Sequence, residues 1–184
     1  MELSIGKLPD KLKAATASAA KSVGVENPPV WQNTQEVATI NLLNLPSLCL
    51  FLDHVAKIEG FKDSNQALKS TRLKNLPWWE TSIWLPLLFD PRPEPTVDSL
   101  GSRSFLGSCP GLISELEDIQ KKSDLDLGVT PPGYEEMRAA PEKTQRSGFT
   151  LHGDHRAAIQ WVWKGLYDGA QLALRNSAPM IGFS

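Results

Sequence analysis

The spacing of apolar residues predicts helices in both halves of the chain. A thin apolar stripe from Leu8 to Val23 predicts a first helix, which Gly24 ends. A second helix is expected from Pro46 to Glu59, with Gly60 as its stop. The stretch 63–73 favours a more polar third helix. Residues 36–45 fit either a short strand or a helix, because apolar runs this short have no decisive period.

The second half carries the two clearest helix patterns. Pro110 suits the first position of a helix, and an apolar face follows it at helical spacing, made of Leu112, Ile113, Leu116 and Ile119. Asp154 is expected to cap the last helix, which runs to about Asn176 by the same periodicity. Apolar residues cover more than one side of this helix, so we expect it to be central.

The segments between these helices favour loops. The Gly- and Ser-rich stretch 99–111 predicts a loop, and 123–150 is polar with Gly148 to Leu151 as a candidate short strand. We therefore predict a mainly α fold: an irregular bundle of about five to seven helices around the C-terminal helix. A small two-stranded β element is compatible with this fold. We treat residues 1–184 as a single domain, with a Pro-rich connector at 90–95 between two helical halves.

Composition places the chain among ordinary globular domains. Its 184 residues are 41% hydrophobic and 22% charged, with a net charge of −2. A slightly acidic chain without a basic stripe is not typical of nucleic-acid binders, so we expect no nucleic-acid partner. Cys49 and Cys109 are too few for a disulfide framework. No apolar run is long enough to cross a bilayer, so we predict a soluble protein of the reducing cytoplasm that does not bind membranes.

Tryptophan is concentrated just before the connector. Trp78, Trp79 and Trp84 lie within fourteen residues, 76–89, and Arg92 follows between prolines. Tryptophan is favoured at binding hot spots and also fills protein cores. Because Trp78 and Trp79 are adjacent, we expect one ring to pack inward and the other outward. These four residues form our candidate partner-binding surface, with core packing as the alternative.

The same argument applies to the last helix. Trp161 and Trp163 are separated by about 200° around a helix with 3.6 residues per turn. We therefore expect only one of these two rings to face the core.

Histidine and carboxylate side chains gather before the last helix. The segment His152-Gly153-Asp154-His155 offers ligands that could meet one divalent ion such as zinc, and His54 would supply a third imidazole. Three histidines with an open coordination position could activate water for hydrolysis. The alternative is that Asp154 only caps the helix and that no cofactor is bound.

These observations favour a non-enzymatic, intracellular protein-binding module. The sequence offers no nucleophile with identifiable partners and no cofactor fingerprint. Small acidic proteins without such motifs include the immunity proteins that neutralise bacterial toxins, so an immunity- or inhibitor-type protein with a protein partner is our leading hypothesis. The alternative is a metal-dependent hydrolase using His54, His152, Asp154 and His155. The sequence names neither the partner nor the oligomeric state.

Overall fold

A mixed β-sheet forms the centre of the protein. The computed structural model describes residues 2–6, 10–22, 24–26, 37–42, 45–67, 73–76, 81–91, 96–97, 103–128, 143–146, 149–152 and 154–183. The six strands of the sheet are β1 (Glu2–Ile5), β2 (Ala38–Asn41), β3 (Thr81–Leu85), β4 (Thr96–Val97), β5 (Arg103–Ser108) and β8 (Met180–Phe183). Their order is β2-β1-β8-β3-β5-β4. Strands β3 and β5 pair in parallel, and the other neighbours pair antiparallel.

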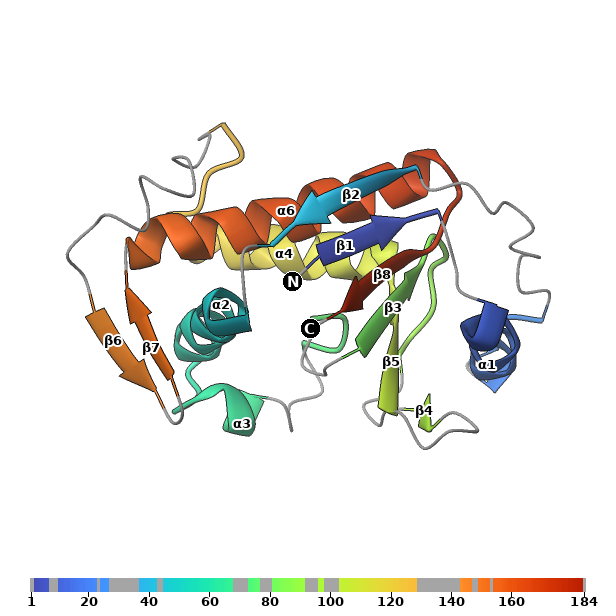
Figure 1. Cartoon of the computed structure of the whole chain (residues 1–184), viewed down its shortest axis with the longest axis horizontal. Helices are drawn as coiled ribbons and strands as arrows, with labels where there is room; N and C mark the ends of the chain where they lie inside the picture. The colour runs from blue at the N-terminus through green and yellow to red at the C-terminus, as the bar shows by residue number, and fades with distance from the viewer. Residues whose placement is uncertain are drawn as a thin grey trace.

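Helices lie on both faces of this sheet (Figure 1). They are α1 (Asp10–Ser22), α2 (Leu45–Ile58), α3 (Ser64–Ala67), α4 (Cys109–Lys121) and α6 (His155–Arg175). Helices α4 and α6 pack on one face, and α2 packs against α6. Helix α1 contributes Ala20 to a smaller cluster on the opposite face. A separate hairpin, β6 (Lys143–Arg146) and β7 (Phe149–His152), lies beside α2.

The alternation of side chains along the strands explains the two clusters. Leu3, Ile5 and Met180 face α6 and belong to the main core. Ile83 and Ile181 point the other way and pack with α1. The sheet is therefore covered on both faces around β3 and β8, which makes it the structural centre.

The prediction of a mainly helical bundle is wrong, because the sheet occupies its centre. Five of the six strands were missed, namely β1, β3, β4, β5 and β8, and three of them show why. Strand β1 has only two inward apolar positions, β8 has four residues, and β5 lies in the stretch 99–111 that its glycine and serine content assigned to a loop. Segments this short do not display a period of two strongly enough to be recognised. The hairpin β6–β7 is a two-stranded element, but it is additional to the main sheet.

Most predicted helices are confirmed. Helix α6 begins after Asp154, whose carboxylate accepts a hydrogen bond from the backbone N–H of Ala157 at 2.8 Å. Helix α4 buries the predicted apolar face, and α2 ends before Gly60, which has a φ of 81°. The third predicted helix is described over Ser64–Ala67, and the rest of its predicted range falls largely on residues that the structure does not describe. Residues 68–72 and 92–95, which include most of the Pro-rich connector, lie outside the description.

Close packing of α6 against the sheet depends on glycine. A Cβ atom at Gly165 would lie 2.5 Å from Leu42 Cδ2, and one at Gly169 would lie 2.8 Å from Met180 Sδ. Gly165 and Gly169 are four residues apart and share one helix face, so the helix can approach the strands along that face. Within the described residues, no helix is both long and apolar enough to cross a membrane.

Candidate functional site

A pocket of about 340 Å³ opens between strand β2 and helix α6. The helix supplies Trp161, Lys164, Gly165 and Asp168, which share one face because they are spaced three and four residues apart. The strand supplies residues 39–41 at an edge of the sheet. Pockets that bind small ligands or single side chains are typically concave and mostly apolar, with a few polar groups. This pocket has that composition.

The floor of the pocket follows from the packing of α6. Gly165 is buried and brings the helix backbone close to β2, where a Cβ would lie 3.5 Å from Ile40 Cγ2. Ile40 is half-buried and packs against the main core. The base of the pocket is therefore formed by the contact between α6 and β2.

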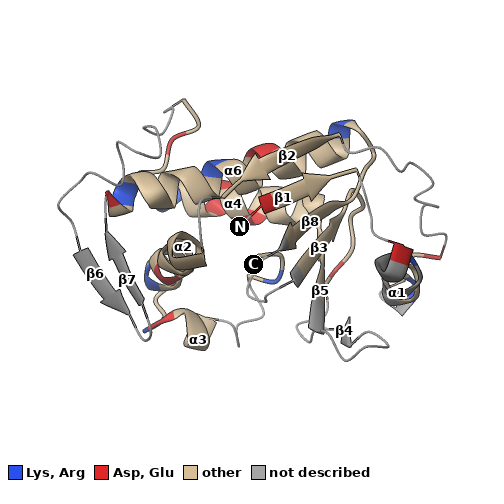
Figure 2. Cartoon of the chain, viewed as in Figure 1, with Lys and Arg blue, Asp and Glu red and all other residues tan. Residues whose placement is uncertain are grey.

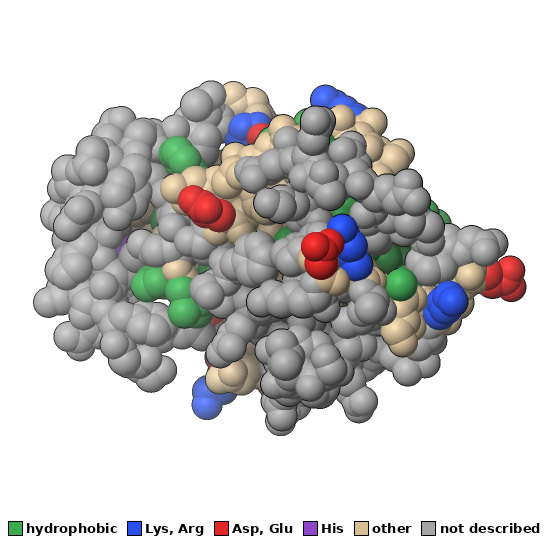
Figure 3. Space-filling model, turned by 45° about the vertical axis from the view of Figure 1, so that its right-hand side comes forward, with side chains coloured by type: hydrophobic (Ala, Val, Ile, Leu, Met, Phe, Trp, Pro, Cys, Tyr) green, Lys and Arg blue, Asp and Glu red, His purple; other side chains and the backbone are tan. Residues whose placement is uncertain are grey.

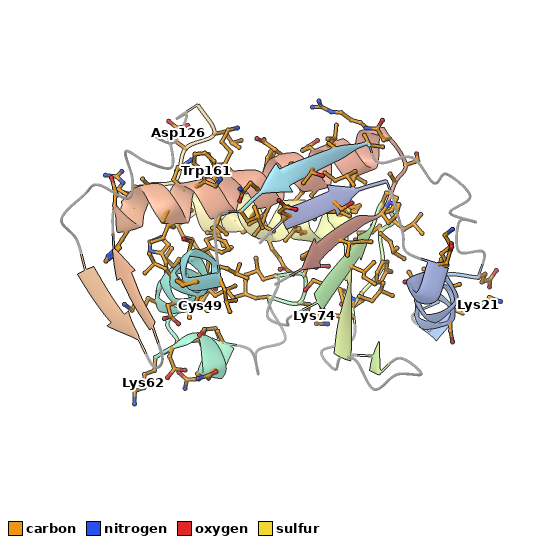
Figure 4. All side chains as sticks on the ribbon, viewed as in Figure 1. Lys21, Cys49, Lys62, Lys74, Asp126 and Trp161 are labelled. Atoms are coloured by element: carbon orange, nitrogen blue, oxygen red, sulfur yellow. The ribbon has the colours of Figure 1, made fainter. Side chains whose placement is uncertain are left out.

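Trp161 forms one wall and is held in place. Its indole N–H donates to the backbone carbonyl of Asn41 at 2.8 Å, and its ring is partly exposed (Figure 4). Trp163, by contrast, is fully buried and donates to the carbonyl of Leu116 at 3.1 Å. The prediction that only one of these two rings faces the core is confirmed. An aromatic ring fixed by a hydrogen bond loses little entropy when it contacts a ligand.

An ion pair stands at the rim. Lys164 Nζ lies 3.0 Å from Asp168 Oδ2, and their side chains are 28% and 49% exposed. The order, with Lys preceding Asp by four residues, is the less favourable one for an i,i+4 pair on a helix. This pair therefore contributes little to the helix and leaves the pocket with both signs of charge.

Charges elsewhere on the described surface are scattered. Acidic and basic residues intermingle along the helices (Figure 2), and the face in Figure 3 carries charged side chains singly or next to one of opposite sign. On that face, the described residues form no broad basic patch of the kind that attracts nucleic acid.

The candidate partner surface around the connector is described only in part. Trp84 is fully buried, and its indole N–H donates to the carbonyl of Asn75 at 2.6 Å. Its ring therefore belongs to the core. Trp78, Trp79 and Arg92 lie outside the described residues, so the role predicted for them stays a prediction.

The candidate metal ligands are also placed only in part. Asp124 forms an ion pair with Arg156, in the first turn of α6, at 2.6 Å. The negative charge of Asp124 also acts on the imidazole of His54. His54 and His155, the first residue of α6, therefore lie at the same end of the helical layer. Among the described residues, no three His, Cys, Asp or Glu side chains form a metal-binding group. The side chain of His152 lies outside the description, so the predicted site stays a prediction.

His54 has an unusual environment. Its Nε2 atom is buried and meets no hydrogen-bond partner among the described residues. Burial lowers the pKa of His54 and Lys57 adds to this effect, whereas the negative charge of Asp124 opposes it. The imidazole is therefore biased toward its neutral form, the form that binds metals.

Sequence reasoning missed a buried polar network around Glu115. The Glu115 carboxylate accepts hydrogen bonds from the backbone N–H of Lys74 at 2.9 Å and of Asn75 at 3.0 Å, and from Asn75 Nδ2 at 2.9 Å. Asn75 Oδ1 in turn accepts from the backbone N–H of Ser108 at 2.8 Å. The sequence did carry a sign of this network, because Glu115 stands three residues after Leu112 and so places a charge within the apolar face of the helix. Burial raises the pKa of Glu115 to about 7.

Cys109 begins α4 next to this network. The thiol is fully buried, and burial raises its pKa to about 12. A thiol that stays protonated is a poor nucleophile, so this cysteine is a packing residue.

Comparison with known protein families, with curated proteins and with solved structures finds no match for this chain. The function is therefore inferred from the residues of the site alone.

Proposed function

We propose that this protein is a non-enzymatic protein-binding module of the immunity or inhibitor type. The observation that supports the proposal is Trp161, a partly exposed ring fixed by its hydrogen bond to Asn41 at the wall of a pocket. Ordered tryptophans beside pockets are typical anchors of protein interfaces. The net charge of −2 and the scattered surface charges agree with a protein partner rather than a nucleic acid.

The polar groups of the pocket favour binding over reaction. Lys164 is engaged by Asp168 at 3.0 Å, an arrangement that suits the recognition of polar groups, and the pocket offers no nucleophile next to a general base among its described lining residues. Cys49 and Cys109 are both thiols, which supports a reducing, cytoplasmic setting.

Affinity purification from the native host tests this function. The tagged wild type is compared with Trp161→Ala and with Leu45→Ala, which removes a 44%-exposed apolar side chain outside the pocket. We expect one stoichiometric protein that the wild type and Leu45→Ala retain and Trp161→Ala loses. Circular dichroism checks that each variant is folded.

A parallel variant tests the second candidate surface. Loss of the partner in Trp78→Ala/Trp79→Ala, with retention in Trp161→Ala, would move the binding surface to the segment 76–95 and keep the binding function. If the wild type captures no stoichiometric partner, the proposed binding function is overturned.

A metal-dependent hydrolase is the second candidate. It is favoured by the buried His54 Nε2 atom on α2, because α2 packs against β7, whose last residue is His152. His54 and His152 would have to meet to hold a divalent ion such as zinc, with Asp154 or His155 as a further ligand, because the described His54, Asp154 and His155 form no metal-binding group by themselves. The measurement is the zinc content of protein from the native host, for the wild type and His54→Ala. One ion per chain, reduced in the variant, is expected, and a metal-free wild type refutes the hydrolase.

A further inference from the structure

We propose that the pocket between β2 and α6 binds an uncharged segment of the partner protein by taking up one aromatic or large aliphatic side chain against Trp161. This inference rests on the proposed function and specifies the chemistry of the partner. It follows from the size of the pocket, its apolar wall and floor, and the two charges at its rim.

Size limits the occupant to about one side chain with its neighbouring backbone. The volume of about 340 Å³ lies near the lower end of the range for ligand pockets. Its base cannot deepen without separating α6 from β2, because Gly165 already brings the two elements into close contact. A large cofactor or a folded helix is therefore a poor fit, whereas a single protruding side chain fits.

The wall and floor favour an apolar occupant. The hydrogen bond from Trp161 Nε1 to the Asn41 carbonyl satisfies the indole N–H, so the polar group of this ring is already engaged. The ring, the half-buried Ile40 and Gly165 all line the pocket and offer apolar surface. Aromatic pairs gain from stacked or edge-to-face contact in addition to burial.

The rim favours an occupant without net charge. Lys164 and Asp168 are the charged side chains that line the pocket among the described residues, and they sum to zero. A charged ligand would be attracted by one member of the pair and repelled by the other, and it would disturb their 3.0 Å contact. The amide groups of a peptide can accept from Lys164 and donate to Asp168 while the pair stays intact.

Titration with four small probes tests this inference directly. The neutral probes are N-acetyl-tryptophan amide and N-acetyl-leucine amide. The charged probes are N-acetyl-tryptophan, an anion, and tryptophan amide, a cation at about pH 6, below the ordinary pKa of an α-amino group. Binding is followed by NMR at the Trp161 indole N–H and the Gly165 amide, because both residues line this pocket. We expect the neutral aromatic probe to bind the wild type most tightly.

Changes at the rim should then reverse the charge preference. In Lys164→Met the carboxylate of Asp168 remains alone, and we expect the cation to gain about fivefold in affinity relative to the neutral probe. In Asp168→Asn the anion should gain by a similar factor. The matched control is Lys121→Met on α4, which breaks an exposed ion pair with Asp118 outside the pocket. This variant should leave the affinities of the cation and of the anion, each relative to the neutral probe, unchanged.

The outcomes separate this inference from the proposed function. Neutral probes that leave both NMR signals unmoved, a charged probe that binds the wild type most tightly, or unchanged ratios in the rim variants overturn the inference. A partner captured through Trp161 without probe binding would overturn only the ligand chemistry. Probe binding without any captured partner would overturn the binding function and leave the pocket chemistry standing.

Discussion

Glu115 should make the stability of the protein depend on pH. Burial raises its carboxyl pKa from 4.5 to about 7, although hydrogen bonds from Lys74, Asn75 and Leu76 favour the charged form and oppose the rise. Between these pH values the folded protein holds a proton that the unfolded chain has released. The free energy of unfolding should therefore fall as pH rises through 7.

The size of this effect follows from the two pKa values. At about 1.4 kcal/mol per pKa unit, the full difference corresponds to about 3.5 kcal/mol. Most of it falls between pH 5 and pH 8, so we expect the contribution of Glu115 to change by about 2 to 3 kcal/mol in that window. Glu115→Gln keeps one oxygen for the N–H groups of Lys74 and Asn75 but does not titrate, so it should lose this dependence.

Urea unfolding followed by tryptophan fluorescence measures the effect. The wild type and Glu115→Gln are unfolded at about pH 5 and pH 8, the window set by the two pKa values, and the difference between them isolates this carboxyl from other titrating groups. Asp118→Asn is the control, because Asp118 is an exposed carboxylate on the same helix whose pKa is lowered by Lys121. The reasoning is refuted if the free energy of unfolding of the wild type minus that of Glu115→Gln stays constant between the two pH values. The hydrogen bonds to Glu115 would then outweigh the effect of burial on its pKa.

Three further predictions concern packing, capping and reactivity. Gly107→Ala should cost about 3 kcal/mol in urea unfolding, because its Cβ would lie 2.5 Å from a ring atom of the buried Trp84; a cost below that of an average surface substitution would contradict this. Asp154→Ala should cost about 1 kcal/mol by losing the cap of α6, and Asp154→Ser should restore most of it in thermal melts. In the native protein a thiol reagent should modify the partly exposed Cys49 and spare Cys109, whose pKa is about 12; unfolding should expose both, and rapid native labelling of Cys109 would argue against its burial.

The sequence allowed the helices to be predicted better than the sheet, and the reason is length. Helix α6 has 21 residues, so its apolar stripes repeat often enough to show its ends and its central place. Strand β1 has four residues, and its partners β2 and β8 begin at Ala38 and Met180. Such pairing depends on contacts between distant parts of the chain, which local propensity does not encode.

The candidate site, too, was predictable in its helical part and not in its strand. The helical period alone predicted that Trp161 and Trp163 face different ways, which is confirmed. The pocket itself could not be predicted, because its second wall is β2, and the stretch around β2 fitted strand and helix equally well. Glu115 could have been recognised as a charge within a buried stripe, but its partners near Asn75 lie 40 residues away along the chain.

Helix α6 connects the stability of the fold to the chemistry of the pocket. One of its faces buries Val162, Leu166 and Ala170 in the main core, and the neighbouring face, with Trp161 and Gly165, forms the pocket wall. Gly165 belongs to both, since it lets the helix approach β2 and also lines the pocket. A side chain at this position would have to displace the buried Leu42 side chain or shift the helix, and either change would affect the core and the pocket together. The pocket is therefore a consequence of how the central helix is seated on the sheet, so substitutions that shift α6 should alter ligand binding even where they touch no lining residue.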